Sequence, residues 1–125
     1  MGGASPWIAI VDDDRSVLKA LTRLLRTRGF QAKTYGSARE FLAALPEGIP
    51  ECLIVDLQMP ELSGLDLHQQ LQHRGIEIPT IIITAHDDIE VPRRCRVAGT
   101  AGYLLKPLED MALFAAIAKA TGRAG

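Results

Sequence analysis

The chain has 125 residues, of which 47% are hydrophobic and 23% charged, and its 14 basic and 15 acidic residues give a net charge of −1 at pH 7. This length suits one domain and the composition is globular, so a disordered or collagen-like chain is excluded. The balanced charge argues against direct nucleic-acid binding, and no apolar run approaches the roughly 20 residues of a membrane span. We therefore expect a single domain over 1–125, with a core at about 7–120, no signal peptide and a cytoplasmic location.

Five apolar, strand-like runs recur along the chain, each followed by a segment with helical periodicity. The expected strands are Trp7–Val11, Gln31–Tyr35, Cys52–Val55, Thr80–Ile83 and Gly102–Leu105. The expected helices are Asp14–Arg28, Ala38–Leu45, Leu65–His73, Ile89–Ala98 and Leu108–Ala120. The blocks IAIV, CLIV and TIII are continuously apolar, which is typical of strands covered on both faces. The alternation predicts an α/β fold with a parallel sheet, helices on both faces and right-handed crossovers.

Local signals indicate the ends of the first two helices. Asp14 is expected to cap the first helix, because its side chain can accept hydrogen bonds from the free N–H groups of the first turn. Ser37 is expected to cap the second helix, in a capping box completed by Glu40. Pro46 is expected to end that helix, since proline cannot donate the hydrogen bond that would continue it.

The fourth and fifth helices carry less regular signals. Pro92 fits only the first turn of a helix, so the fourth helix is expected to be short and to start near Glu90 or Val91. The spacing of apolar residues in the fifth helix predicts that four side chains face the core: Leu108, Met111, Phe114 and Ile117.

The cysteines and two of the histidines have no spacing that indicates a metal site. Cys52 and Cys95 form no C-x-x-C pair, and we expect both to be small buried hydrophobic residues. His68 and His73 are five positions apart and do not share a helix face as a zinc-binding pair would. We expect both histidines at the surface.

Polar residues follow four of the five expected strands. They are Asp12, Asp13 and Asp14 after the first strand, Asp56 after the third, Thr84 after the fourth and Lys106 after the fifth. Because ligands of parallel sheets bind at the carboxyl ends of the strands, we expect these side chains to converge on one rim. Each alone is typical of a loop or a helix cap. The grouping of Asp12 and Asp13 with Asp56 brings no structural benefit, because like charges repel and raise one another's pKa values.

A hard divalent cation would remove this repulsion. Oxygen ligands without histidine favour Mg²⁺ over Zn²⁺. Mg²⁺ in proteins keeps several waters and prefers one or two carboxylates with a phosphate oxygen, so the set indicates a site for a phosphoryl group. A flavin mononucleotide site would need a Ser/Thr/Gly-rich loop after the first strand, where this chain has three aspartates that would repel the phosphate.

Four motifs resemble, in the correct order, the receiver domain of bacterial response regulators: IAIVDDD, LIVDLQMPELSGLDL, TIIITA and AGYLLKP. The segment SAREFL resembles the receivers of FixJ-like regulators. The resemblance spans about residues 7 to 120. It implies a flavodoxin-like (βα)5 three-layer sandwich with strand order 2-1-3-4-5. It also implies a signalling domain rather than an enzyme, which takes a phosphoryl group from a sensor histidine kinase or phosphotransfer protein onto Asp56 and loses it only slowly by itself.

The resemblance also implies a metal-binding role for four residues. Asp13 and Asp56 would bind Mg²⁺ directly, together with the backbone carbonyl of Gln58. Asp12 would act mainly through water.

Further roles concern the phosphoryl group and the switch. By resemblance, Thr84 and Lys106 bind the phosphoryl oxygens, and Tyr103 is the switch aromatic residue that rotates from a solvent-facing to a buried position. Gln58 and His86 influence how long the phosphoryl group lasts. The resemblance further implies a cis peptide bond before Pro107.

The output surface would be the face formed by the fourth helix, the fifth strand and the fifth helix, through which a homodimer is also possible. Three arginines lie on that helix: Arg93, Arg94 and Arg96. They are either a solvated basic face or a surface for an acidic partner. The acids of a second copy that fit this role are Glu109 and Asp110.

Two other functions stay open. A Mg²⁺-dependent phosphohydrolase with an Asp nucleophile usually has a second Asp two positions later, where this chain has Gln58, which cannot transfer the proton. An interaction domain that has kept the fold without the switch would not need all four of the residues at the rim: Asp13, Asp56, Thr84 and Lys106.

Overall fold

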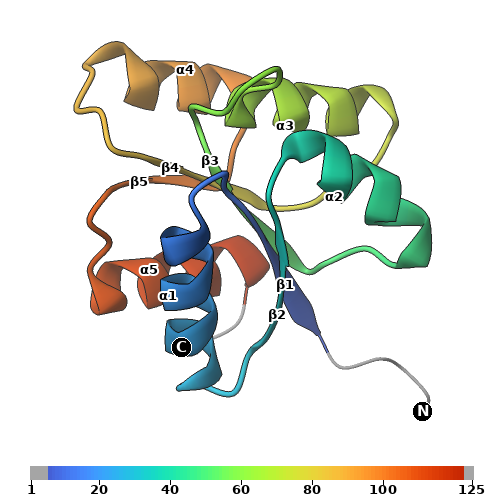
Figure 1. Cartoon of the computed structure of the whole chain (residues 1–125). Coiled ribbons are helices and arrows are strands. Elements are labelled where there is room, and N and C mark those ends of the chain that lie inside the picture. The colour runs from blue at the N-terminus through green and yellow to red at the C-terminus, as the bar shows by residue number, and fades with distance from the viewer. Residues whose placement is uncertain (1–5, 123–125) are drawn as a thin grey trace.

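The computed structural model describes residues 6–122, which form one parallel sheet between two layers of helices (Figure 1). The strand order is β2-β1-β3-β4-β5, as expected. The strands are β1 Trp7–Val11, β2 Gln31–Tyr35, β3 Cys52–Asp56, β4 Thr80–Thr84 and β5 Gly102–Leu105. The helices are α1 Arg15–Arg26, α2 Ala38–Ala44, α3 Gly64–His73, α4 Glu90–Ala98 and α5 Asp110–Thr121, with a short 3-10 helix η1 at Leu45–Glu47.

The helices cover opposite faces of the sheet, α1 and α5 on one side and α2, α3 and α4 on the other (Figure 1). Alternate residues of each central strand supply the two cores: Leu53 and Val55 face one layer, and Cys52 and Ile54 face the other. Every residue of β3 and β4 is buried, which explains the apolar runs CLIV and III within them. Of the described helices, none is long and apolar enough to cross a membrane.

The sheet register aligns the strand ends that carry the polar residues. Val11 pairs with Val55, so Asp12 lies at the level of Asp56 on the neighbouring strand. The third and fourth strands each run one residue further than expected, and Asp56 and Thr84 are their last residues. The expected convergence on one rim is therefore a direct result of the register.

The helix caps are partly as predicted. Asp14 caps α1 and accepts hydrogen bonds from both the backbone N–H and the hydroxyl of Ser16. Ser37 caps α2, because its hydroxyl accepts a hydrogen bond from the N–H of Glu40. The Glu40 carboxylate accepts from the N–H of Gly36 instead of the N–H of Ser37, so only one of the two hydrogen bonds of the expected capping box forms. The complete capping box lies at Ser63 and Asp66 of α3, where the S-x-x-D pattern of the sequence signals it.

The second helix ends before Pro46, as expected. The α-helix ends at Ala44, and the chain continues as η1 with Pro46 in its first positions, where a missing N–H costs nothing. Pro92 lies in the first turn of α4, which begins at Glu90 as predicted.

Two predictions about burial are wrong. The helix α5 starts at Asp110, two residues later than expected, and its inward residues are Leu113, Phe114 and Ile117, while Met111 is 77% exposed. His68 is 6% exposed and therefore buried rather than at the surface, because the apolar face of α3 that contains Leu67 and Leu71 includes it. His73 is exposed, and Cys52 and Cys95 are buried and free, as expected.

Candidate functional site

Three carboxylates meet at the carboxyl ends of β1 and β3. One oxygen from each of Asp12, Asp13 and Asp56 lies within 4.8 Å of the others. Asp12 is fully buried, Asp56 is 7% exposed, and Asp13 is exposed. A set of oxygen donors of this kind, with no nitrogen or sulfur ligand, suits a hard cation such as Mg²⁺.

Lys106 links two of these carboxylates. Its Nζ lies 2.8 Å from Asp12 Oδ2 and 3.4 Å from Asp56 Oδ1. Burial alone would lower the pKa of Lys106, but the hydrogen bond and the charge of Asp12, together with Asp56, outweigh burial and raise that pKa. The lysine therefore stays protonated and supplies a positive charge at the carboxylates.

The pKa of Asp56 is raised above its usual value. Burial is the largest cause, followed by the negative charge of Asp12, and Asp13 adds to it. Lys106 acts in the opposite direction without cancelling these effects. The negative charge of Asp56 is thus only partly compensated by Lys106, and a bound cation would stabilise the ionised carboxylate.

The carboxylate oxygens of Asp12 are both used by the chain itself. Oδ1 accepts a hydrogen bond from the N–H of Asp14, and Oδ2 contacts Lys106. Asp12 therefore helps to position the β1–α1 loop and Lys106 at the same time.

Thr84 places a buried hydroxyl at the same rim. The side chain is fully buried, and its Oγ1 accepts a hydrogen bond from the N–H of His86 at 3.1 Å. Its carbonyl accepts from the N–H of Lys106 at 2.7 Å, which ties the end of β4 to the residue after β5. The peptide bond between Lys106 and Pro107 is cis, as expected.

The loop after Asp56 is held close to the strand. The N–H of Leu57 donates to the carbonyl of Ile83, and the N–H of Gly64 donates to the carbonyl of Leu57. A Cβ atom on Gly64 would lie 2.7 Å from the carbonyl oxygen of Asp56, which is closer than Cβ contacts allow. The need for glycine at position 64 comes from this close approach to the strand that ends in Asp56.

The remaining candidates lie around this rim. Gln58 and His86 are exposed. Tyr103 is half-buried and packs against the core cluster that contains Val91 and Cys95. Burial raises the pKa of the Tyr103 hydroxyl. The ring thus lies between the two positions that the resemblance implies for the switch residue, one facing solvent and one fully buried.

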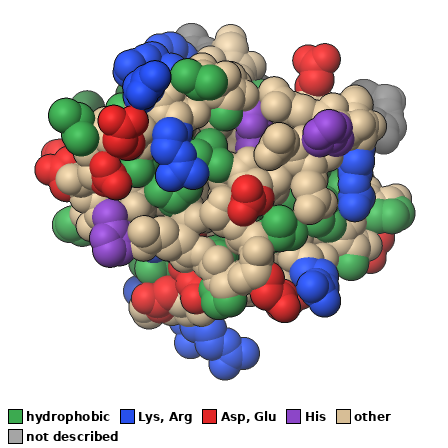
Figure 2. All heavy atoms as spheres, turned by 90° about the horizontal axis from the view of Figure 1, so that it is seen from above, with side chains coloured by type: hydrophobic (Ala, Val, Ile, Leu, Met, Phe, Trp, Pro, Cys, Tyr) green, Lys and Arg blue, Asp and Glu red, His purple; other side chains and the backbone are tan. Residues whose placement is uncertain are grey.

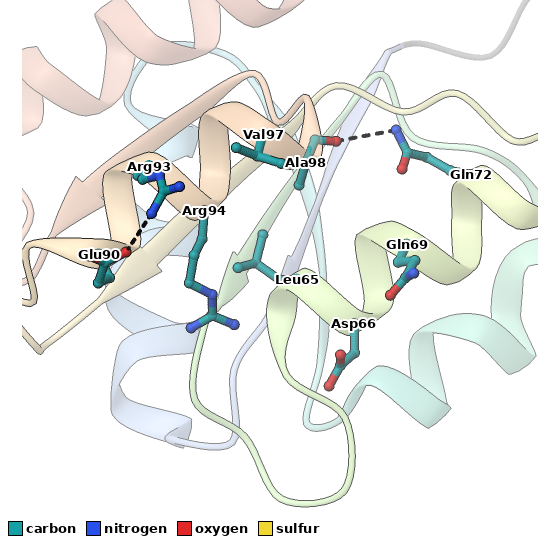
Figure 3. A pocket seen from close by; sticks show the side chains of 9 residues that line it. All are labelled: Leu65, Asp66, Gln69, Gln72, Glu90, Arg93, Arg94, Val97 and Ala98. Atoms are coloured by element: carbon teal, nitrogen blue, oxygen red, sulfur yellow. Dashed lines mark hydrogen bonds and ion pairs between the residues drawn. The ribbon is translucent and has the colours of Figure 1, made fainter.

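The arginines of α4 do not form one patch. Arg93 and Arg94 line a groove toward α3, while Arg96 does not (Figure 3). From above the molecule, basic side chains lie at separate places among acidic and hydrophobic ones (Figure 2).

Comparisons with known proteins agree with the fold and show the family. Residues 8–118 match the family described as "Response regulator receiver domain". The chain is 39% identical over 116 residues to Nodulation protein W of Bradyrhizobium diazoefficiens, covering 93% of this chain and 51% of that protein. It is 38% identical over 114 residues to the transcriptional regulatory protein FixJ of Rhizobium meliloti, covering 91% and 56%. The chain therefore spans about half the length of these relatives.

Solved structures give the same result. The crystal structure of FixJ-N superposes with a TM-score of 0.87 at 35% identity and covers 98% of both chains. A response regulator receiver protein from Burkholderia phymatum superposes with a TM-score of 0.85 at 40% identity, covering 97% of this chain and 98% of that one.

Proposed function

This chain belongs to the response regulator receiver domain family, whose members are phosphoacceptors in two-component signalling, and we propose that Asp56 is the residue that accepts the phosphoryl group. The observation that carries the proposal is the position of Lys106 against a carboxylate that ends a strand. Asp12 is fully buried with both oxygens engaged, so a donor cannot reach it. Asp13 is exposed and forms no ion pair with Lys106 among the described residues. Asp56 alone of the three combines access to a donor with a contact to that ammonium.

The transfer itself needs no general base, because a carboxylate already carries the attacking electron pair. An oxygen of Asp56 forms a bond to phosphorus while the bond between phosphorus and the donor's histidine nitrogen breaks. The electron pair of that bond stays on the nitrogen, which later takes a proton from water. Negative charge spreads over the phosphoryl oxygens, and the ammonium of Lys106 stabilises it.

The three carboxylates fit Mg²⁺, and we expect Asp13, Asp56 and the carbonyl of Gln58 to hold it, with Asp12 acting mainly through water. When bound, Mg²⁺ neutralises charge on the carboxylates and the phosphoryl oxygens. Lys106 can then exchange its contact with Asp56 for one with a phosphoryl oxygen.

The response begins at Thr84. Its hydroxyl can donate to a phosphoryl oxygen while its oxygen still accepts from His86. A displacement of Thr84 would change the space beside Tyr103. The equilibrium between two conformations of the face formed by α4, β5 and α5 would then shift. Gln58 and His86, both exposed beside the site, are placed to influence how fast water removes the phosphoryl group.

The donor would be a sensor histidine kinase or a phosphotransfer protein. A groove of about 930 Å³ begins at Lys106 and runs along α1 past Leu24. Four basic residues line the exposed side of α1: Arg15, Lys19, Arg23 and Arg26. This groove gives a donor an apolar contact that leads directly to the site.

A second copy of the chain, bound through the face of α4, β5 and α5, would be another partner. Arg93 and Arg94 line the groove toward α3, which leaves Arg96 as the arginine for pairing with Glu109 or Asp110 of a second copy. Phosphorylation should then promote self-association that weakens with salt. Sedimentation that shows a monomer in both phosphorylation states, at low and high salt, would exclude this dimer.

Mass spectrometry after incubation with acetyl phosphate and Mg²⁺ tests the main proposal. We expect a stable gain of one phosphoryl group, which is lost in Asp56→Asn and when EDTA removes the metal. Release of inorganic phosphate with no stable gain would indicate a phosphohydrolase instead. No phosphorylation of the folded wild-type chain would contradict the phosphoacceptor role.

A further inference from the structure

We propose that the groove between α3 and α4 binds an acidic segment of a partner protein that carries one apolar side chain. The groove has a volume of about 480 Å³ and lies outside the phosphoacceptor site (Figure 3). Its walls are Leu65 and Gln69 of α3 and Arg94, Val97 and Ala98 of α4. This inference goes beyond phosphate acceptance, and its test uses the unphosphorylated chain.

The apolar part of the groove is open to a partner. Val97 is 81% exposed, although valine is usually buried, and it lies across the groove from Leu65 (Figure 3). Ala98 adds a small side chain to the same wall. An aliphatic side chain placed between Val97 and Leu65 would remove this surface from water.

The groove is lined by two acidic and two basic side chains, and its two arginines differ in whether they are paired. The Asp66 carboxylate accepts from the N–H of Ser63 in the capping box, and Glu90 Oε1 lies 3.4 Å from Arg93 Nη1. Arg94 has no carboxylate within ion-pair distance in the part of the chain that the structure describes. A partner carboxylate can therefore pair with its guanidinium through two parallel hydrogen bonds.

Arg94 also borders a second hollow. This hollow of about 500 Å³ is lined by the loop after Asp56, including Gln58 and Met59. Figure 3 shows the guanidinium extending from α4 toward that loop. A bound segment can thus extend from the helix pair onto the loop while it contacts Arg94.

The other end of the groove is closed by the chain itself. The side-chain amide of Gln72 donates to the carbonyl of Ala98 at 3.4 Å, which links α3 to α4. The groove therefore exists before a partner binds. Because Asp66 and Glu90 also line the groove, a segment with a single carboxylate directed at Arg94 fits it, whereas a nucleic acid would bring several phosphates close to these two carboxylates.

A random library of twelve-residue peptides, selected on the immobilised unphosphorylated chain, tests the proposal without a known partner. We expect the enriched peptides to contain Asp or Glu beside an aliphatic residue. Amide chemical shifts should change along α3 and α4 when such a peptide binds. Arg94→Glu should weaken binding at least about tenfold, and Val97→Ser should weaken it in the same direction.

Arg96→Glu is the matched control, because it makes the same charge change on the same helix outside the groove. All three variants should fold, because these side chains are exposed and lie outside both cores. Val97→Ser and Arg96→Glu should also accept a phosphoryl group from acetyl phosphate like the wild type. Peptides that bind Arg94→Glu as tightly as the wild type, that lack acidic residues, or that fail to enrich at all would overturn the proposal. Self-association of the wild-type chain that Arg94→Glu abolishes would also overturn it, by making a second copy the occupant.

Discussion

The ammonium of Lys106 lies 2.8 Å from the carboxylate of Asp12, a residue 94 positions earlier in the chain. The two residues follow β5 and β1, which are separated in the sheet by β3 and β4. Asp12 is fully buried, so this contact supplies the main positive charge for a carboxylate that is shielded from water. The same ammonium contacts Asp56, so one lysine serves both the stability and the chemistry of the site.

Replacing Lys106 should therefore destabilise the fold. Lys106→Met keeps the apolar stem but leaves Asp12 buried without its ion-pair partner, and we expect the free energy of unfolding at pH 7 to fall by about 2–3 kcal/mol. Lys119→Met is the control, because Lys119 is exposed and has no ion-pair partner in the described part of the chain. Equal losses in the two variants, measured by urea unfolding, would contradict a structural role for the pair.

Asp56→Asn should raise stability. The pKa of Asp56 is raised, first by burial and then by Asp12, so the folded chain binds this proton more tightly than the unfolded chain. Stability that is present at low pH is therefore lost as the pH rises through the raised pKa, and a penalty remains at neutral pH. Because asparagine carries no charge at this position, we expect Asp56→Asn to raise Tm at pH 7 by about 3–6 °C. A lower Tm than that of the wild type, with Glu77→Gln as a control on the surface, would contradict this electrostatic account.

Metal binding should depend unequally on the three carboxylates. Asp13→Ala should weaken Mg²⁺ binding at least about tenfold, and Asp12→Ala should weaken it less, because both oxygens of Asp12 already have partners within the chain. Amide chemical shifts near Asp13 and Gln58 are the suitable readout. Trp7 is less suitable, since it begins β1 at the opposite end of the strand and stacks with Lys33. Equal losses in the two variants would show that Asp12 binds the metal as directly as Asp13.

His68 should make stability depend on pH. Burial lowers the pKa of this histidine, so the folded chain favours the neutral ring. Its contribution is fully present above the unfolded pKa of about 6.5 and is lost as the pH falls below it. The loss of unfolding free energy between about pH 7.5 and about pH 5.5 should be smaller in His68→Leu than in the wild type. His73→Leu, at an exposed position, should behave like the wild type, and a His68→Leu profile that parallels the wild type would refute the assignment.

The sequence predicted the parts of the structure that follow from local pattern. The continuous apolar runs of β3 and β4 predicted buried parallel strands, and the polar residues at the strand ends, such as Asp56 and Thr84, predicted the rim. The pairing of Lys106 with Asp12 was not predicted, because two residues 94 positions apart are joined only by the register of the whole sheet.

The errors arose where tertiary packing decides. In α5, Phe114 and Ile117 face the core as predicted, but the third buried residue is Leu113, and Met111 lies outside the buried face. His68 is buried because its neighbours on α3 are apolar, although histidine itself gives no signal of burial. Gly64 resembles an ordinary turn residue in the sequence, and only the distance to the Asp56 carbonyl reveals why no larger residue fits.

The central claim is that the phosphoryl group is bonded to Asp56 and to no other acid of the cluster. Borohydride converts an aspartyl phosphate to homoserine, so reduction of the chain after treatment with acetyl phosphate and Mg²⁺, followed by peptide mapping, locates the bond directly. The account predicts homoserine at position 56 and unchanged aspartates at positions 12 and 13. Homoserine at position 12 or 13, with an intact Asp56, would contradict it.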